Sequence, residues 1–196
     1  MWVLSPFEES YVIEGDCRSE IKTNRLFLRQ FGKKDLDVYS RIMGDREVGR
    51  WFPKGDGYTR EEAERSLDSI LDHWTKHGFG IWAMTDKEKK ILLGRCGLNL
   101  IAETSEVELD FVVARDCWGR GYATEAATAA LEFGFGILKL DRIIALSRPE
   151  NTASRRVIEK MGMTYRKEAE YWGIVCAYYD IPKADYQSIR AKGKRP

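Results

Sequence analysis

The stretch WGRGYATEA, residues 118–126, lies between two segments of different periodicity and decides the fold of this chain. A run of strand-like residues, Val107 to Val113, leads into it, and a helix-like run, Ala123 to Ile137, leads out. Gly119 and Gly121 let the backbone approach a ligand closely because no Cβ intervenes. The first N–H groups of the helix lack internal partners and, with the helix dipole, form a site for an anion, most often a phosphate. The stretch therefore predicts a strand–turn–helix unit that holds a phosphorylated cofactor.

Three kinds of cofactor use a glycine turn of this type. A Walker A loop requires a lysine followed by serine or threonine after its last glycine, and this stretch has neither. A Rossmann fingerprint requires a third small residue where Thr124 stands, and it opens a domain, whereas this turn lies in the second half of the chain. Acyl-coenzyme A is the third kind, and a glycine turn that binds no ligand is the alternative.

The stretch resembles the pyrophosphate loop of the GNAT superfamily of N-acetyltransferases, and most closely that of its RimJ/RimL-like branch of ribosomal-protein acetyltransferases. Residues 23–29 are similar to the first strand of that family, residues 108–113 to its central strand, and residues 151–163 to its last helix. The resemblance covers about residues 21 to 181. Asp110 departs from the pattern, since the family usually has glycine there.

The order of elements predicts an α+β, three-layer fold with a mixed, mostly antiparallel central sheet and helices on both faces, which is the GNAT fold. Residues 33–43 read as a helix, and a capping box at Thr59 opens another, which ends at Gly78. Hairpins are expected over 79–101 and 164–180. The expected organisation is an N-terminal extension (1–20), one GNAT domain (21–185) and a C-terminal tail (186–196). The resemblance implies that the central strand and its neighbour splay apart to admit the acyl-pantetheine arm.

Acetyl transfer to an amine requires that the amine lose a proton and that the leaving thiolate be protonated or stabilised. Strand alternation places Glu108, Asp110 and Val112 on one face, and the resemblance implies that Glu108 is the general base. Asp110 is the second candidate, and a purely structural carboxylate at Glu108 is the alternative. The resemblance also implies that Ser154 donates to the departing thiolate, unless it is only a polar residue of the first helical turn. Asn151 is expected to bind the pantetheine amide or to cap the last helix, two compatible roles.

The resemblance implies that the loop amides hold the pyrophosphate of acetyl-CoA and that the backbone of the central strand pairs with the pantetheine arm. The expected cofactor-binding residues are Val112, Val113, Trp118, Gly119, Arg120, Gly121, Tyr122, Ala123, Thr124 and Asn151. No metal is expected, because His73 and His77 flank Trp74 rather than a glutamate and no third ligand is evident. One or two of Trp51, Phe52, Trp82 and Trp172 are expected to line the acceptor site.

Composition limits the partners. The chain has 196 residues, enough for one domain, and its charged share of 32% leaves a formal net charge of +1, so nothing favours nucleic acid. No apolar run approaches the roughly 18 residues of a membrane span, and no signal peptide is evident. The cysteines (Cys17, Cys96, Cys117 and Cys176) are scattered without a zinc pattern, as in a cytoplasmic protein with reduced thiols.

The predicted function is therefore acetyl transfer from acetyl-CoA to a primary amine by direct attack in a ternary complex. A protein or peptide α-amine fits best, because it titrates near 8 whereas a lysine amine titrates near 10.4. A small-molecule amine, such as an antibiotic or a polyamine, and a non-catalytic acyl-CoA sensor are the alternatives. The oligomeric state stays open, with a homodimer as one option.

Overall fold

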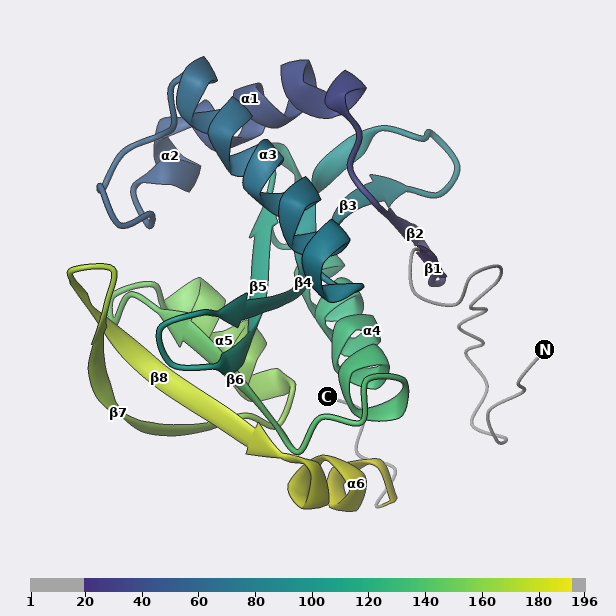
Figure 1. Cartoon of the computed structure of the whole chain (residues 1–196), viewed down its shortest axis with the longest axis vertical. Coiled ribbons are helices and arrows are strands. Elements are labelled where there is room, and N and C mark those ends of the chain that lie inside the picture. The colour runs from purple at the N-terminus through teal and green to yellow at the C-terminus, as the bar shows by residue number, and fades with distance from the viewer. Residues whose placement is uncertain (1–19, 192–196) are drawn as a thin grey trace.

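In the computed structural model, which describes residues 20–191, eight strands form one sheet in the order β1-β2-β3-β4-β5-β6-β8-β7 (Figure 1). All neighbours are antiparallel except β5 and β6, which are parallel. The mixed, mostly antiparallel sheet predicted from the sequence is thereby confirmed. The strands are β1 (Glu20–Lys22), β2 (Leu26–Arg29), β3 (Ile81–Asp86), β4 (Leu92–Ile101), β5 (Glu106–Val113), β6 (Arg142–Ser147), β7 (Thr164–Tyr171) and β8 (Ile174–Pro182).

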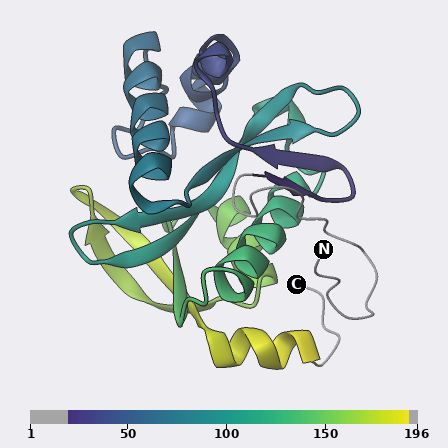
Figure 2. The ribbon, with the colours of Figure 1, turned by 45° about the vertical axis from the view of Figure 1, so that its right-hand side comes forward.

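Helices cover both faces of this sheet (Figure 2). On one face, Arg95 of β4 hydrogen-bonds to Tyr39 of α1 and to Ser66 of α3. On the opposite face, Gly134 of α4 lies against Leu98 and Ile143, so closely that a Cβ would come within 2.9 Å of both. The helices are α1 (Leu36–Gly44), α2 (Arg46–Gly49), α3 (Arg60–His77), α4 (Tyr122–Gly136), α5 (Thr152–Lys160) and α6 (Lys183–Ala191), with short 3-10 turns η1 (Lys33–Asp35) and η2 (Arg115–Cys117).

Helix α3 begins and ends at the residues expected. Thr59 accepts a hydrogen bond from the Glu62 N–H, while the Glu62 carboxylate accepts one from the Thr59 N–H. Gly78 ends the helix in the left-handed conformation, with φ of 69°. These caps hold the helix that forms one wall of the site.

Strands β5 and β6 separate toward their carboxyl ends. They pair at Glu108 and Ile144, and no further pair follows among the described residues. Beyond this point β5 continues to Val113 and β6 to Ser147. The gap that the family resemblance implied is therefore present.

One strand and two α-helices were not predicted from the sequence: β1, α2 and α6. The expected domain boundary at residue 185 falls inside α6. Tyr186 is buried and stacks on Phe135 of α4 with ring centroids 4.6 Å apart, so this segment is part of the packed domain. The expected N-terminal extension lies outside the described residues apart from Glu20. None of the helices within residues 20–191 has the length and apolar character needed to cross a membrane.

Candidate functional site

The glycine turn before α4 has the backbone that a ligand loop needs. Gly119 and Gly121 both adopt the left-handed conformation, with φ of 72° and 78°. A Cβ built at Gly119 meets nothing within 4 Å, so the approach to this backbone is open. Gly121 is the N-cap residue of α4, which leaves the first N–H groups of the helix directed at the turn. The turn therefore fits an anionic group such as a pyrophosphate.

A cluster of hydrogen bonds holds this turn against the segment that joins β1 to β2. The Glu125 carboxylate of α4 accepts hydrogen bonds from the Thr23 hydroxyl, from the Arg25 backbone N–H at 2.7 Å and from the Arg25 Nε at 2.7 Å. The Arg25 guanidinium also donates to the Arg120 carbonyl and lies over the Tyr122 ring. Sequence reasoning placed residues 23–29 in the first strand only. The structure shows a further role for Thr23 and Arg25, because their side chains order the predicted cofactor loop.

Backbone directions decide which part of β5 faces the gap. The Ala114 N–H donates to the Leu93 carbonyl of β4 at 2.7 Å. Because these directions alternate along an antiparallel pair, Val112 also points its backbone groups at β4 and Val113 points them at the gap. The Val113 carbonyl accepts a hydrogen bond of 2.7 Å from the indole of Trp118, which anchors the turn to the strand.

Helix α5 brings Asn151 and Ser154 to the far side of the gap. Asn151 caps the helix, since its side-chain oxygen accepts a hydrogen bond of 3.1 Å from the Ser154 N–H. The amide N–H groups of Asn151 are not used in this bond. Both side chains line the large open cavity on the α1–α3 face of the sheet.

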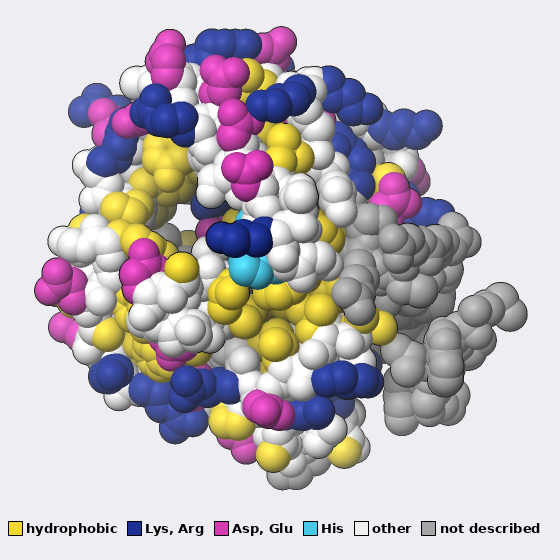
Figure 3. Space-filling view, in the orientation of Figure 1, with side chains coloured by type: hydrophobic (Ala, Val, Ile, Leu, Met, Phe, Trp, Pro, Cys, Tyr) yellow, Lys and Arg dark blue, Asp and Glu magenta, His cyan; other side chains and the backbone are white. Residues whose placement is uncertain are grey.

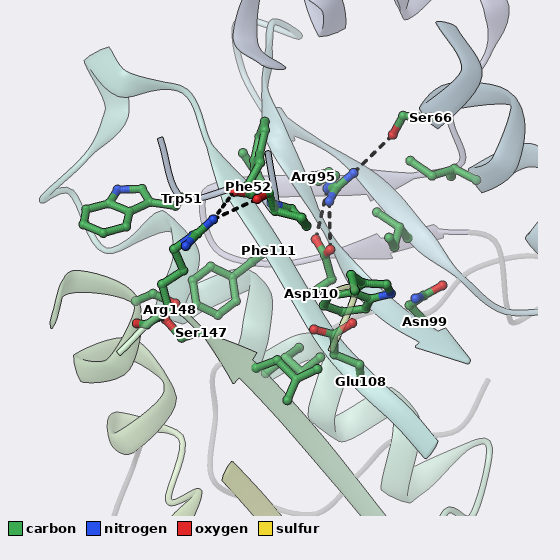
Figure 4. A pocket seen from close by; sticks show the side chains of 18 of the residues that line it. Trp51, Phe52, Ser66, Arg95, Asn99, Glu108, Asp110, Phe111, Ser147 and Arg148 are labelled. Carbon is green, nitrogen blue, oxygen red and sulfur yellow. Dashed lines mark hydrogen bonds and ion pairs between the residues drawn. The ribbon is translucent and has the colours of Figure 1, made fainter. Parts of the chain in front are cut away.

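This cavity, about 490 Å³ in volume, joins residues from distant parts of the chain (Figures 3 and 4). Figure 3 shows the hollow with hydrophobic side chains on one side and a histidine near its rim. Trp51, Phe52 and Trp172 line it, which is more than the one or two expected among the four aromatic candidates, whereas Trp82 does not. Trp82 is fully buried and packs edge-on against Trp74 and Phe133, so it belongs to the core. Further lining residues include Tyr58, His73, Arg95, Asn99, Glu108, Asp110, Phe111, Val112, Ser147 and Arg148.

Glu108 lies in this cavity at the point where β5 and β6 separate, and only 5% of it is exposed. Burial raises the pKa of its carboxyl well above the usual range, and the charge of Asp110 raises it further. Arg95 and a hydrogen bond from Asn99 oppose this shift only in part. A carboxylate with a raised pKa is a better proton acceptor near neutral pH.

Asp110 is engaged in a different way. Its two oxygens accept hydrogen bonds of 3.0 and 2.8 Å from Nε and Nη2 of Arg95, which form a bidentate ion pair (Figure 4). Arg95 also donates to the Tyr39 hydroxyl at 2.9 Å. The pair and its surroundings occupy both carboxylate oxygens of Asp110 and favour Glu108 as the proton acceptor. No sequence pattern marked Arg95, because its role depends on a partner on the neighbouring strand.

His73 is bound to the backbone through both ring nitrogens. Nδ1 lies 2.8 Å from the Phe79 carbonyl, and Nε2 accepts a hydrogen bond of 3.0 Å from the Leu100 N–H. Nε2 must therefore be unprotonated and Nδ1 must carry the proton. Burial lowers the pKa of this histidine, which agrees with a neutral ring.

Known proteins match this chain in sequence and in fold. Residues 25–164 match the family model described as the acetyltransferase (GNAT) domain. The chain is 31% identical over 170 residues to the uncharacterized protein YkkB of Bacillus subtilis, with 84% of this chain and 96% of YkkB covered. The crystal structure of a GNAT-family acetyltransferase from Bacillus anthracis is similar, with a TM-score of 0.72, 29% identity, and 84% of this chain and 99% of that one covered. RimJ of Mycobacterium smegmatis, solved with CoA-disulfide, shares the fold at a TM-score of 0.68 and 20% identity, over 86% and 90% of the two chains.

Fold, loop and cavity together define an enzyme that moves an acyl group from acetyl-CoA to an amine. The chain belongs to the GNAT acetyltransferase family and is an acetyl-CoA-dependent N-acetyltransferase.

Proposed function

We propose that this enzyme acetylates the α-amine of a protein or peptide, with Glu108 as the general base and Ser154 as the general acid. The observation that carries the proposal is the buried Glu108 carboxyl with its raised pKa, placed where β5 and β6 separate. An α-amine titrates near 8, so a carboxylate base with a raised pKa can remove its proton near neutral pH. Direct attack in a ternary complex needs no acyl-enzyme, because amine and thioester are held together.

Acetyl-CoA supplies the acetyl thioester, and the residues around the gap would bind it. The N–H groups of residues 119–124 and the Arg120 side chain would hold the pyrophosphate, with Trp118 supporting the turn. The backbone of Val113 and the side-chain amide of Asn151 would bind the pantetheine arm. Val112, also expected to pair through its backbone, would contribute its side chain to the cavity wall instead.

Ser154 would protonate the leaving thiolate. It follows Asn151 in the first turn of α5 and lines the cavity, and its hydroxyl makes no side-chain bond within residues 20–191. Replacement by alanine is expected to lower kcat by about 10²–10⁴-fold with little change in acetyl-CoA affinity, provided that chemistry limits the rate.

A small-molecule amine is the second candidate. Spermidine N(1)-acetyltransferase of Escherichia coli K12 is 24% identical to this chain over 151 residues. A polyamine site needs carboxylates for several cations, whereas here Asp110 is already paired with Arg95. A non-catalytic acyl-CoA sensor would have no need for both Glu108 and Ser154 in one cavity.

The function is tested by thiol release from acetyl-CoA with a panel of peptide α-amines, polyamines and aminoglycosides. Turnover with peptides above that with the other classes is expected. Equal or better turnover with polyamines or aminoglycosides would contradict the α-amine assignment. No thiol release with any amine would favour the sensor.

Cofactor binding has a matched pair of variants. Gly119 and Gly55 have φ of 72° and 74°, and a Cβ at either meets nothing within 4 Å. Glutamate at each position brings the same strain and charge, but only Gly119→Glu places that charge at the predicted pyrophosphate site. Acetyl-CoA at 100 times its Kd is expected to stabilise the parent and Gly55→Glu by about 2.7 kcal/mol and Gly119→Glu hardly at all. Equal stabilisation of the two variants would refute the loop assignment.

A further inference from the structure

Arg148 follows the last residue of β6 and extends over the acceptor cavity. Its Nη2 donates to the carbonyls of Phe52 and Pro53, both at 2.9 Å (Figure 4). These two bonds hold the guanidinium between the end of β6 and the segment that joins α2 to α3. The charge is therefore positioned by the fold.

The hydrogen-bonding capacity of Arg148 is incomplete. A guanidinium has five N–H donors, and here Nη2 alone has protein acceptors among residues 20–191. Nε is buried without an acceptor, and within residues 20–191 the partners of this side chain are the two carbonyls and no carboxylate. A buried donor without a partner costs about 1–3 kcal/mol, so such a group in a ligand cavity calls for an oxygen atom from outside the protein.

Only some of the charged side chains in the cavity form ion pairs with each other. Among the described residues, four charged side chains line the cavity, and Arg95 and Asp110 neutralise each other. Glu108 and Arg148 remain, one acid and one base without an ion-pair partner in the described part of the chain. Burial raises the pKa of the Cys176 thiol of β8, and the charges of Glu108 and Arg148 act on it in opposite directions. Glu108 and Arg148 line the same cavity.

We propose that Arg148 binds the carbonyl or carboxylate oxygen next to the acceptor amine, so that the enzyme selects α-aminoacyl compounds over plain alkylamines. This inference rests on the proposed function and names the chemistry that its acceptor must carry. The amine lies at Glu108, and the oxygen of the first residue accepts from the guanidinium. A polyamine has no such oxygen, and its second ammonium group would be repelled by Arg148.

An amine next to a carbonyl or carboxylate oxygen occurs both at a peptide N-terminus and in a free amino acid. Alanylalanine amide and free alanine represent them, and alanine amide is the smallest neutral acceptor of this class. Isopropylamine has the same carbon skeleton as alanine amide without the carboxamide. Comparing each variant with the parent on the same acceptor cancels the difference in amine pKa.

The decisive measurement is kcat/KM of the parent, Arg148→Met and Arg148→Lys for these acceptors. Arg148→Met is expected to lose about 10- to 100-fold on the α-aminoacyl acceptors, as for a hydrogen bond to a charged group, and little on isopropylamine. Arg148→Lys keeps the charge and is expected to recover part of the loss. The parent's kcat/KM for alanylalanine amide and for free alanine are compared with each other. The acceptor with the higher value shows whether the site binds peptide N-termini or free amino acids.

A purely structural role for Arg148 predicts a different result. If it only ties the segment at Phe52 to β6, Arg148→Met lowers kcat/KM by the same factor for every acceptor, and the proposal is overturned. Arg46→Met, on the exposed surface of α2, controls for the loss of an arginine. Thermal stabilisation by acetyl-CoA verifies that each variant is folded. Failure of the proposed function looks different, since the parent itself would then release no thiol with any amine.

Discussion

At the scale of single residues, two carboxylates two positions apart on β5 have different fates. Arg95 neutralises Asp110, whereas Glu108 is buried opposite Asn99 and keeps a raised pKa. Environments that give neighbouring carboxyl groups different pKa values are a common basis for acid–base catalysis. The difference can be tested through both activity and stability.

Glu108→Gln is expected to reduce kcat/KM by about 10²–10⁴-fold, and most strongly at low pH. Raising the pH supplies neutral amine from solution, so the difference from the parent should narrow near pH 8 to 9 for an α-amine and only above about 10 for a lysine. Rate profiles between pH 6 and 10.5 measure this. Parent-like rates at every pH would mean that Glu108 does not accept the proton.

The same substitution should also affect stability. The pKa of Glu108 is higher in the folded state than in the unfolded chain, so the folded state favours the neutral carboxyl. That contribution is complete below the unfolded pKa of about 4.3 and is lost as pH rises through the folded pKa. Glu108→Gln should therefore become more stable than the parent as pH rises toward 8.5, in thermal melts of the apoprotein.

Asp110→Asn is expected to destabilise the protein, in contrast to Glu108→Gln. It leaves Arg95 charged and unpaired, with side chains that are only 12% and 20% exposed, and should cost about 3 kcal/mol. If Glu108→Gln destabilises and Asp110→Asn does not, the assignment of the two environments is reversed.

At the scale of elements, the β7–β8 hairpin extends an aromatic residue into the acceptor cavity. Tyr171 pairs with Ile174, so Trp172 and Gly173 form a two-residue turn in which both have positive φ, 51° and 73°. Tyr171 and Tyr178 each donate to Glu106 at 2.7 Å, which ties the hairpin to β5. Tryptophan in this conformation is strained, which is consistent with a side chain kept for function.

Trp172→Asn should separate stability from substrate binding. Asparagine tolerates the left-handed conformation, so unfolding should cost about 1 kcal/mol more, while KM for the acceptor rises and acetyl-CoA affinity is unchanged. Lys139 also has positive φ, 59°, and does not line the cavity, so Lys139→Asn is the matched control. A KM unchanged by Trp172→Asn would exclude the indole from acceptor binding.

At the scale of the whole molecule, His73 joins α3, the segment before β3, and β4 through its two ring nitrogens. Protonation of Nε2 would break the bond from the Leu100 N–H. The folded pKa is lowered, chiefly by burial, so the unfolded chain binds more protons and stability falls as pH drops below about 6.5. His73 therefore lowers the stability as the pH falls, whereas Glu108 lowers it as the pH rises. Together the two residues limit the pH range in which the folded state is stable.

The difference in unfolding free energy between pH 7.5 and 5.5 should therefore be smaller in His73→Gln than in the parent. Urea denaturation at the two pH values measures it. His77→Gln is the control, since His77 is the other histidine of the chain. An equal acid loss in His73→Gln and the parent would assign the effect to other groups.

Local patterns were sufficient to predict most elements of this protein. The caps of α3 and the turn before α4 depend on residues adjacent in sequence, so they could be predicted without the fold. The short β1 and α2 and the terminal α6 were missed, because pairing or packing with distant segments stabilises them. Trp82 could not be separated from the other aromatic candidates for the same reason: its type suits a binding site, but its neighbours place it in the core.

The tertiary structure alone decided the chemistry of the site. The sequence determined that two carboxylates share one face of β5, since side chains alternate along a strand. Which carboxylate is paired depends on Arg95, 15 positions away from Asp110. The gap between β5 and β6, the position of Trp172 and the hydrogen bonds that hold Arg148 to Phe52 and Pro53 likewise depend on segments far apart in sequence. Burial and charge come from neighbours in space, so pKa and ligand preference could be inferred only once the chain was folded.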